Sequence, residues 1–209
     1  MRIGIVTVLS GLGGGLYQHS LNILHALDLW KREGCQDEFV LFVDNTNHPI
    51  IKSLTEHGWE IKPMPSSSKQ HRVLDILRQI VGEGPHREVW RRLRQKFRQS
   101  KKEELANPEI VRFNPQMSRW LHRCGIDLMF YSVPTPMSFE TGIPYVTFIM
   151  DLQHRLQPHF PEVSADGEWE RREYLFRNAI RYATLLFVDS EAGKDDVLTF
   201  YGSYGITSD

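Results

Sequence analysis

Several features that would assign a function directly are missing from this sequence of 209 residues. No apolar stretch approaches the roughly 20 residues that a transmembrane helix needs. The two cysteines, Cys35 and Cys124, match no metal-binding spacing, and two reduced thiols are the default interpretation. No HxH, HExxH or GxSxG motif occurs, so the common signatures of zinc sites and serine hydrolases are excluded.

An excess of one sign of charge is also lacking, because the formal net charge is −1. This balance, with 41% hydrophobic residues, is ordinary for a globular protein and gives no overall indication of nucleic-acid binding. The apolar run Ile3–Leu9 is too short for a signal peptide and lacks its flanks. We interpret it as a first strand and expect a cytoplasmic protein with one substantial core.

Short β-rich apolar runs alternate with helical patterns along the chain, which predicts an α/β fold with a doubly wound, mostly parallel, Rossmann-like sheet. The predicted strands are Arg2–Val8, Phe39–Val43, Trp59–Ile61, Ile126–Tyr131, Tyr145–Met150 and Leu185–Val188. Helices are predicted at about 16–32, 49–57, 114–124, 166–181 and 190–202, with Asn114, Asp166 and Ser190 as caps. One helix is expected between the last two strands, and Pro134 and Pro136 predict a rigid extended loop at 132–136.

Glycines follow the first strand and lead into the first helix, as in a Rossmann-type half. A dinucleotide fingerprint needs glycines at G-x-G-x-x-G spacing. Counted from Gly11 or Gly13, the last glycine position holds Leu16 or Gln18, so the fingerprint fails. A flexible turn without a ligand remains the competing interpretation.

The middle of the chain breaks the alternation with a helical, strongly basic insertion at about 66–112. Within it, Trp90, Leu93 and Phe97 form a narrow apolar stripe among many cations. Such a helix can lie on an anionic membrane surface, and the residues expected to make that contact are Trp90, Arg91, Arg92, Arg94 and Arg98. The alternative is a solvated helix that packs through the same three side chains.

Polar groups follow several predicted strands, and in a parallel sheet these strand ends meet at one edge. The expected members of this rim are Gly14, Gly15, Ser132, Asp151, His154, Arg155, Ser190 and Glu191. Carboxylates, imidazoles and hydroxyls form hydrogen bonds with sugar hydroxyls, so the set suits a polyhydroxylated ligand. Each residue also has a structural alternative: a cap, a buried loop histidine or a partner of a helix dipole.

The sequence resembles the N-terminal domain of a GT-B glycosyltransferase, and the closest group is family 4, also called group 1. The matching segments are Gly14-Gly15, Ile149–His154 with Pro158–Phe160, Arg172 with Phe176 and Arg177, Val188–Glu191 with Lys194 and Asp195, and Phe200–Gly202. The match runs from Met1 to Gly202 and is most specific from Tyr145 onward. Met150 departs from the pattern, because many members have a histidine there.

The resemblance implies that residues 1–209 form the acceptor-binding domain of a retaining glycosyltransferase, without the C-terminal domain that binds the nucleotide-sugar donor. Gly14 and Gly15 would approach the donor phosphates or the acceptor, and Asp151 would orient or deprotonate the acceptor hydroxyl. The acceptor would be a glycan or a lipid-linked molecule. No metal or cofactor is expected, and the donor would be bound mainly by the C-terminal domain or by a partner chain.

Two alternatives stay open at this point. The chain could be a membrane-docking or scaffold subunit of a split glycosyltransferase, located at the inner face of the membrane. It could also be a Rossmann nucleotide-binding protein, which nucleotide titration calorimetry would detect. Under the first interpretation a partner chain supplies the donor site.

The membrane-docking interpretation predicts that the chain floats with vesicles that contain anionic lipids. Changing Arg91, Arg92 and Arg94 to Glu should abolish flotation, because the cations bind lipid phosphates. Vesicles of neutral lipid serve as the control. Flotation that is absent, or unchanged in the triple variant, would contradict this interpretation.

Overall fold

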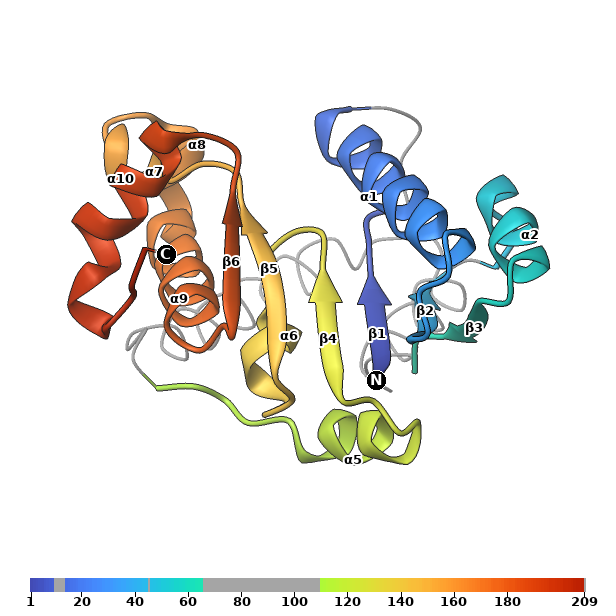
Figure 1. Ribbon diagram of the computed structural model, residues 1–209. Coiled ribbons are helices and arrows are strands. Elements are labelled where there is room, and N and C mark those ends of the chain that lie inside the picture. The colour runs from blue at the N-terminus through green and yellow to red at the C-terminus, as the bar shows by residue number, and fades with distance from the viewer. Residues whose placement is uncertain (10–13, 45, 66–109, 209) are drawn as a thin grey trace, which may run out of the picture. The chain divides into compact units, whose positions relative to one another are not determined.

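Six parallel strands form one sheet in the computed structural model, which describes residues 1–9, 14–44, 46–65 and 110–208 (Figure 1). The strand order is β3-β2-β1-β4-β5-β6. The strands are β1 Arg2–Val6, β2 Glu38–Val43, β3 Glu60–Pro63, β4 Leu128–Tyr131, β5 Tyr145–Ile149 and β6 Leu185–Val188. The predicted fold class, a doubly wound parallel α/β sheet, is confirmed.

The helices alternate with the strands, and α10 follows the last strand. They are α1 Gly15–Arg32, α2 Pro49–Glu56, α5 Pro115–Arg123, α6 Pro136–Glu140, α7 Gln153–Leu156, α8 Pro161–Ser164, α9 Glu168–Arg181 and α10 Glu191–Tyr201. Short 3-10 turns cover Ala165–Gly167 and Gly202–Tyr204. None of the helices in the described ranges is long and apolar enough to cross a membrane.

The strand order reverses where β1 pairs with β4. Ile3 pairs with Leu128 and Val6 with Tyr131, while β1 also pairs with β2 along its other side. Because all the strands are parallel, their carboxyl ends lie at the same edge, and α1 begins at that edge (Figure 1). A reversal of this kind is where open α/β sheets bind their ligands.

Helix α1 packs over β1 and β2 through Leu24, which is fully buried against Ile5 and Leu41. Leu16 and Trp30 of the same helix are about half exposed. On the opposite face of the sheet, Tyr145 donates a hydrogen bond from its hydroxyl to the Ala179 carbonyl of α9, at 2.7 Å. The core therefore lies on both sides of the sheet.

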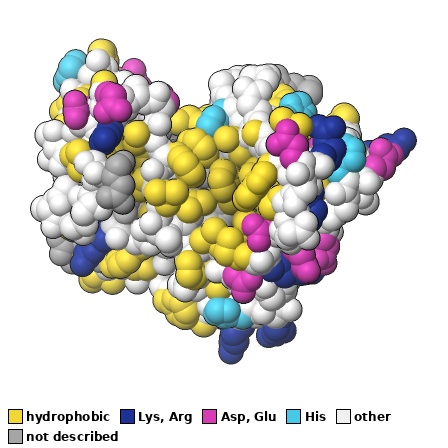
Figure 2. All heavy atoms as spheres, in the orientation of Figure 1, with side chains coloured by type: hydrophobic (Ala, Val, Ile, Leu, Met, Phe, Trp, Pro, Cys, Tyr) yellow, Lys and Arg dark blue, Asp and Glu magenta, His cyan; other side chains and the backbone are white. Residues whose placement is uncertain are grey.

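The α1 face of the sheet carries an aromatic ladder over β4, β5 and β6. Phe148 contacts Phe130 on one side and stacks on Phe187 on the other, with ring centroids 4.9 Å apart in the stacked pair. Phe187 is 38% exposed, and Leu185 beside it in β6 is 51% exposed. Figure 2 shows the resulting apolar area in the middle of this face.

Two of the three predicted caps are confirmed. The Asn114 side chain accepts from the Met117 N–H at 3.0 Å, and the Ser190 hydroxyl accepts from the Gly193 N–H at 3.1 Å. Asp166 is not a cap. Its backbone is left-handed, with φ of 56°. A 3-10 turn leads into the helix, so α9 begins after Gly167 instead.

One expectation about the connections was wrong, and another differs by one residue. The loop after β4 is present but ends at Thr135, because Thr135 caps α6 by accepting from the Met137 N–H at 3.1 Å and Pro136 occupies the first helical turn. Proline fits that position since its missing N–H would have no helical partner. Between β5 and β6 the chain forms α7 and α8 before α9, where one helix was expected.

The predicted insertion lies almost wholly outside the described residues. The chain divides into a unit of Met1–Pro63 with Pro108–Asp209 and a second unit of Met64–Asn107. The expected membrane-contact residues Trp90, Arg91, Arg92, Arg94 and Arg98 all fall within 66–109, so their role stays a prediction.

Gly4 in the middle of β1 leaves no room for a side chain. A Cβ there would lie 2.5 Å from Met129 Sδ and 2.8 Å from Phe42 Cε2. We expect Gly4→Ala to lower the free energy of unfolding by about 1–3 kcal/mol, because overpacking displaces neighbouring side chains. Denaturant unfolding monitored by circular dichroism measures the change.

Gly202 is the matched control for this substitution. Its φ is −58°, and a Cβ there would meet no atom within 4 Å. Gly202→Ala should therefore change stability by less than about 0.5 kcal/mol, as surface substitutions usually do. Equal effects at both positions would contradict the packing argument.

Candidate functional site

The candidate site is the rim formed by the carboxyl ends of the strands. Gly14 and Gly15 open α1, Asp151 follows β5, and Ser190 and Glu191 follow β6. All five residues are exposed. The parallel sheet thus delivers them to one edge, although their roles in binding remain predictions.

Gly14 precedes α1 with φ of 108°, which glycine adopts readily, and within the described residues no side chain caps the helix. No acidic residue lies in the first turn, and among the described residues a Cβ at Gly14 or Gly15 would meet no atom within 4 Å. The first N–H groups of a helix have no partner within the helix, and together with the helix dipole they favour an anionic group at this position.

Ser132 does not line the rim as predicted. It is fully buried after β4, and its hydroxyl lies 3.0 Å from that of Ser20 in α1. The Ser20 hydroxyl also accepts from the Val8 N–H at 3.1 Å. The two serines therefore join β1, α1 and β4 just below the rim, and Ser132 positions the opening of α1 instead of contacting a ligand.

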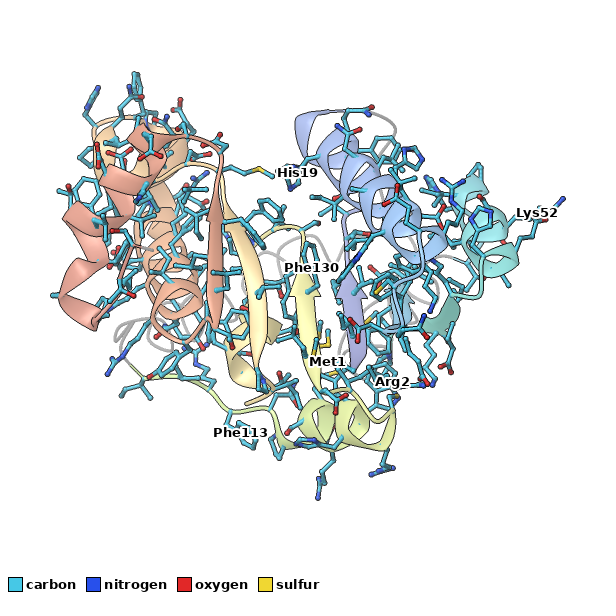
Figure 3. The ribbon with its side chains drawn as sticks, viewed as in Figure 1. Met1, Arg2, His19, Lys52, Phe113 and Phe130 are labelled. Atoms are coloured by element: carbon cyan, nitrogen blue, oxygen red, sulfur yellow. The ribbon has the colours of Figure 1, made fainter. Side chains whose placement is uncertain are left out.

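His19 is a rim residue that the sequence did not single out. Its ring meets that of Phe148 in an edge-to-face contact with centroids 4.8 Å apart. Figure 3 shows His19 between α1 and the end of β5. Its Nε2 is buried and, within the described residues, has no hydrogen-bond partner. The only signal in the sequence that could have identified His19 is its position as a polar residue next to Ser20, on the side of α1 that meets the sheet.

Asp151 is exposed and lies two residues before the start of α7. Its Oδ1 accepts from the Gln153 N–H at 3.1 Å, and within the described residues Oδ2 makes no hydrogen bond. One carboxylate oxygen of Asp151 thus fixes the turn that leads into α7.

A pocket of about 200 Å³ lies between the ends of β5 and β6. Its lining includes Met150, Asp151, Gln153, Leu156, Asp189, Ser190, Gly193 and Asp196. Three of these residues carry carboxylates and two carry neutral polar side chains. Hydrogen-bond acceptors therefore outnumber donors in this part of the rim.

Glu191 and Ser190 have local roles at α10. Ser190 caps the helix, and the Glu191 side chain is 89% exposed, with Lys194 3.8 Å away. A carboxylate in the first turn also stabilises the helix dipole. Both residues stay exposed at the rim, so their local contacts do not prevent either of them from contacting a ligand.

His154 and Arg155 differ from expectation, since they enter a buried ionic network instead of standing on the rim. His154 is fully buried, with Nε2 3.3 Å from Glu173 Oε2 and 3.2 Å from the Tyr201 hydroxyl. Arg155 donates to both Glu173 oxygens, and the Tyr201 hydroxyl donates to Glu173 at 3.1 Å. The network joins α7, α9 and α10 beneath Asp151.

Glu173 is the common acceptor of this network. Burial opposes its ionisation, but hydrogen bonds from His154 and Arg155 outweigh burial and hold the pKa of Glu173 below its usual value. Removing one partner of a buried ion pair leaves the other charge uncompensated. The short α7, which has no side-chain cap, therefore depends on Glu173 for its position.

A second pocket, of about 400 Å³, lies between α1 and α2, away from the predicted rim residues. Some of the polar groups that line it are paired: Tyr17 Oη lies 3.0 Å from His48 Nε2, and Asp28 Oδ2 lies 2.9 Å from Nδ1 of His57, which is outside the lining. These contacts hold the two helices together.

Metal ligands do not gather in the described part of the chain, where no group of three His, Cys, Asp or Glu side chains could hold an ion. Cys35 and Cys124 are free thiols.

Comparison with known proteins gives no family assignment. No family model and no curated protein matches the chain. Among solved structures, the UDP-GlcNAc 2-epimerase of Methanocaldococcus jannaschii matches with a TM-score of 0.44 and 11% identity, over 95% of this chain and 42% of that one. MurG of Acinetobacter baumannii matches with a TM-score of 0.34 and 10% identity, over 90% and 41%.

This chain therefore spans about two fifths of the length of these two structures. Similarity at this level carries no argument about function, and the fold assignment rests on the strand order itself.

Glu173→Gln should lower the free energy of unfolding at pH 7 by about 3 kcal/mol, because it leaves Arg155 without its charged partner in a mostly buried site. Glu170→Gln, on the exposed side of the same helix, is the control and should change stability by less than about 0.5 kcal/mol. Urea unfolding measures both.

The pH dependence follows from the lowered pKa of Glu173. Its stabilising contribution is complete above the usual glutamate pKa of about 4.3 and is lost as the pH falls through the lower folded-state pKa. Wild type should therefore lose stability more steeply than Glu173→Gln between about pH 4.5 and pH 2. Parallel curves for the two proteins would show that Glu173 does not carry this dependence.

Proposed function

We propose that this chain is the acceptor-binding half of a retaining GT-B glycosyltransferase. The complete enzyme would move a sugar from a nucleotide-sugar to a glycan or a lipid-linked acceptor. The observation that carries the proposal is the rim at the strand-order reversal, where an uncapped helix start at Gly14 and Gly15 shares one edge with the exposed Asp151.

The chemistry of the rim supports a sugar ligand with a phosphate. The open N–H groups of α1 suit an anion, and the carboxylates near β5 and β6 suit hydroxyl donors. Asp151 is proposed to orient the acceptor hydroxyl, since the residue is exposed and, within the described residues, only one of its carboxylate oxygens makes a turn contact. A group held at hydrogen-bond distance from the attacking oxygen raises the rate mainly through orientation.

Asp151 need not be an essential base in this proposal. In the family that the sequence resembles, the departing diphosphate is thought to take the proton of the acceptor hydroxyl. The donor and its diphosphate would be held mainly by a C-terminal domain or by a partner chain. No cofactor is required for this transfer, in which the nucleotide-sugar is a substrate.

The first test is turnover. We expect the Met1–Asp209 chain alone to neither transfer nor hydrolyse the sugar of a nucleotide-sugar, because catalysis needs both substrates positioned. Release of nucleoside diphosphate from a panel of nucleotide-sugars measures this. Turnover above the uncatalysed rate would overturn the assignment to an acceptor half.

The second test is binding. Titrating the ¹⁵N-labelled chain with methyl and octyl glycosides should shift the amide signals of Gly15, Asp151 and Glu191. Asp151→Asn should weaken the response at least threefold, whereas Glu56→Gln, exposed at the end of α2, should leave it unchanged. Shifts that avoid the rim altogether would contradict the proposal.

A further inference from the structure

The pocket between α1 and α2 contains a buried carboxylate that packing does not require. Asp28 lines this pocket of about 400 Å³, and only 6% of the residue is exposed. It lies in the C-terminal part of α1, where the helix dipole disfavours a negative charge. Because burial also opposes an ionised carboxylate, the residue needs a reason beyond filling space.

Two neighbours hold the Asp28 carboxylate in place without using all of it. His57 Nδ1 lies 3.0 Å from Oδ1 and 2.9 Å from Oδ2, and Arg32 Nε lies 3.4 Å from Oδ2. A carboxylate has about four lone-pair sites, so these contacts leave acceptor capacity on a side chain that lines the pocket. Asp28 can therefore accept a further hydrogen bond from a ligand.

Tyr17 supplies a donor to the same pocket. The ring nitrogen Nδ1 of His48 accepts from the Ile50 N–H at 3.3 Å, so the proton of this ring is on Nε2. Nε2 lies 3.0 Å from the Tyr17 hydroxyl and donates to its oxygen. The hydroxyl proton of Tyr17 then has no acceptor within the described residues, and it is available to a ligand.

The pocket is a groove along both helices. From α1 it is lined at helical spacing over three turns, about 16 Å, by Tyr17, Leu21, His25 and Asp28. From α2 and its cap it is lined by His48, Pro49, Ile50, Ser53 and Leu54. Polar and apolar side chains therefore alternate along a groove that is long enough for more than one sugar ring.

We propose that the groove between α1 and α2 binds an uncharged glycan chain. Sugar hydroxyls both donate and accept, which suits Asp28 and Tyr17, and the carbon faces of sugar rings suit Leu21 and Ile50. No lysine or arginine is among the described lining residues, so an anion would face Asp28 without a compensating cation. A cation gains less there, because Arg32 already lies beside the carboxylate.

The inference goes beyond the proposed function, since none of the predicted rim residues lines the groove. It assigns this domain a second place where a glycan is held. The groove is also preformed, because Leu24 of α1 packs in one core cluster with Ile51 and Leu54 of α2. Its volume falls in the range of about 300–1,000 Å³ that is usual for ligand pockets.

The first measurement is titration of the ¹⁵N-labelled chain with maltotriose, cellotriose and mannotriose. At least one of these neutral trisaccharides should shift the amide signals of Tyr17, His25 and Ser53. Inorganic phosphate at the same concentration should leave these signals unchanged, because the groove has a carboxylate and no lysine or arginine in its described lining.

The second measurement compares variants. Ser53→Trp fills the groove from the exposed face of α2 and should abolish the shifts. Lys52→Trp is the matched control and should bind as wild type does, because Lys52 is exposed and points away from α1 (Figure 3). Tyr17→Phe removes only the hydroxyl, and its Kd should rise by about threefold to tenfold, the usual effect of one hydrogen bond.

Three results would overturn the inference. One is that no trisaccharide shifts the signals of the groove, and another is that phosphate shifts them in place of the sugars. The third is that Tyr17→Phe binds as tightly as wild type, a result that decides the matter even if Ser53→Trp fails to fold. Glycoside-induced shifts at Gly15 and Asp151 alongside any of these would leave the proposed function standing.

Discussion

The pairing of β1 with β4 is the constraint on which the rest of the structure depends. It places two strands that are far apart in sequence side by side, and it reverses the direction in which the sheet grows. The close approach requires Gly4, since Met129 and Phe42 occupy the space of a side chain there. Every candidate ligand group then follows from parallel strands that end at the same edge.

The rim combines residues that hold it in place with residues that stay accessible. Ser20 and Ser132 are fully buried and fasten α1 to the ends of β1 and β4. Glu173 does the same for α7 under Asp151. The exposed Gly15 and Asp151 therefore belong to segments that buried hydrogen bonds hold in position, as a preorganised site requires.

Much of the fold could be predicted from the sequence, because the apolar runs, the caps at Asn114 and Ser190 and the glycine turn are local signals. The positions of Ser132, His154 and Arg155 could not. Their burial depends on Ser20 and Glu173, which are distant in sequence and carry no pattern of their own. A polar residue that follows a strand gives the same sequence pattern whether its side chain faces solvent or pairs with a residue of another helix.

The buried network beneath α7 also constrains how the sequence can change over evolution. Its members come from three helices and meet at a single carboxylate, that of Glu173. A lineage that loses Glu173 would also have to replace Arg155 and His154, or leave a cation and an imidazole without an acceptor. Covariation among these three positions and Tyr201 would therefore preserve the path of the chain beneath the rim even where the exposed residues diverge.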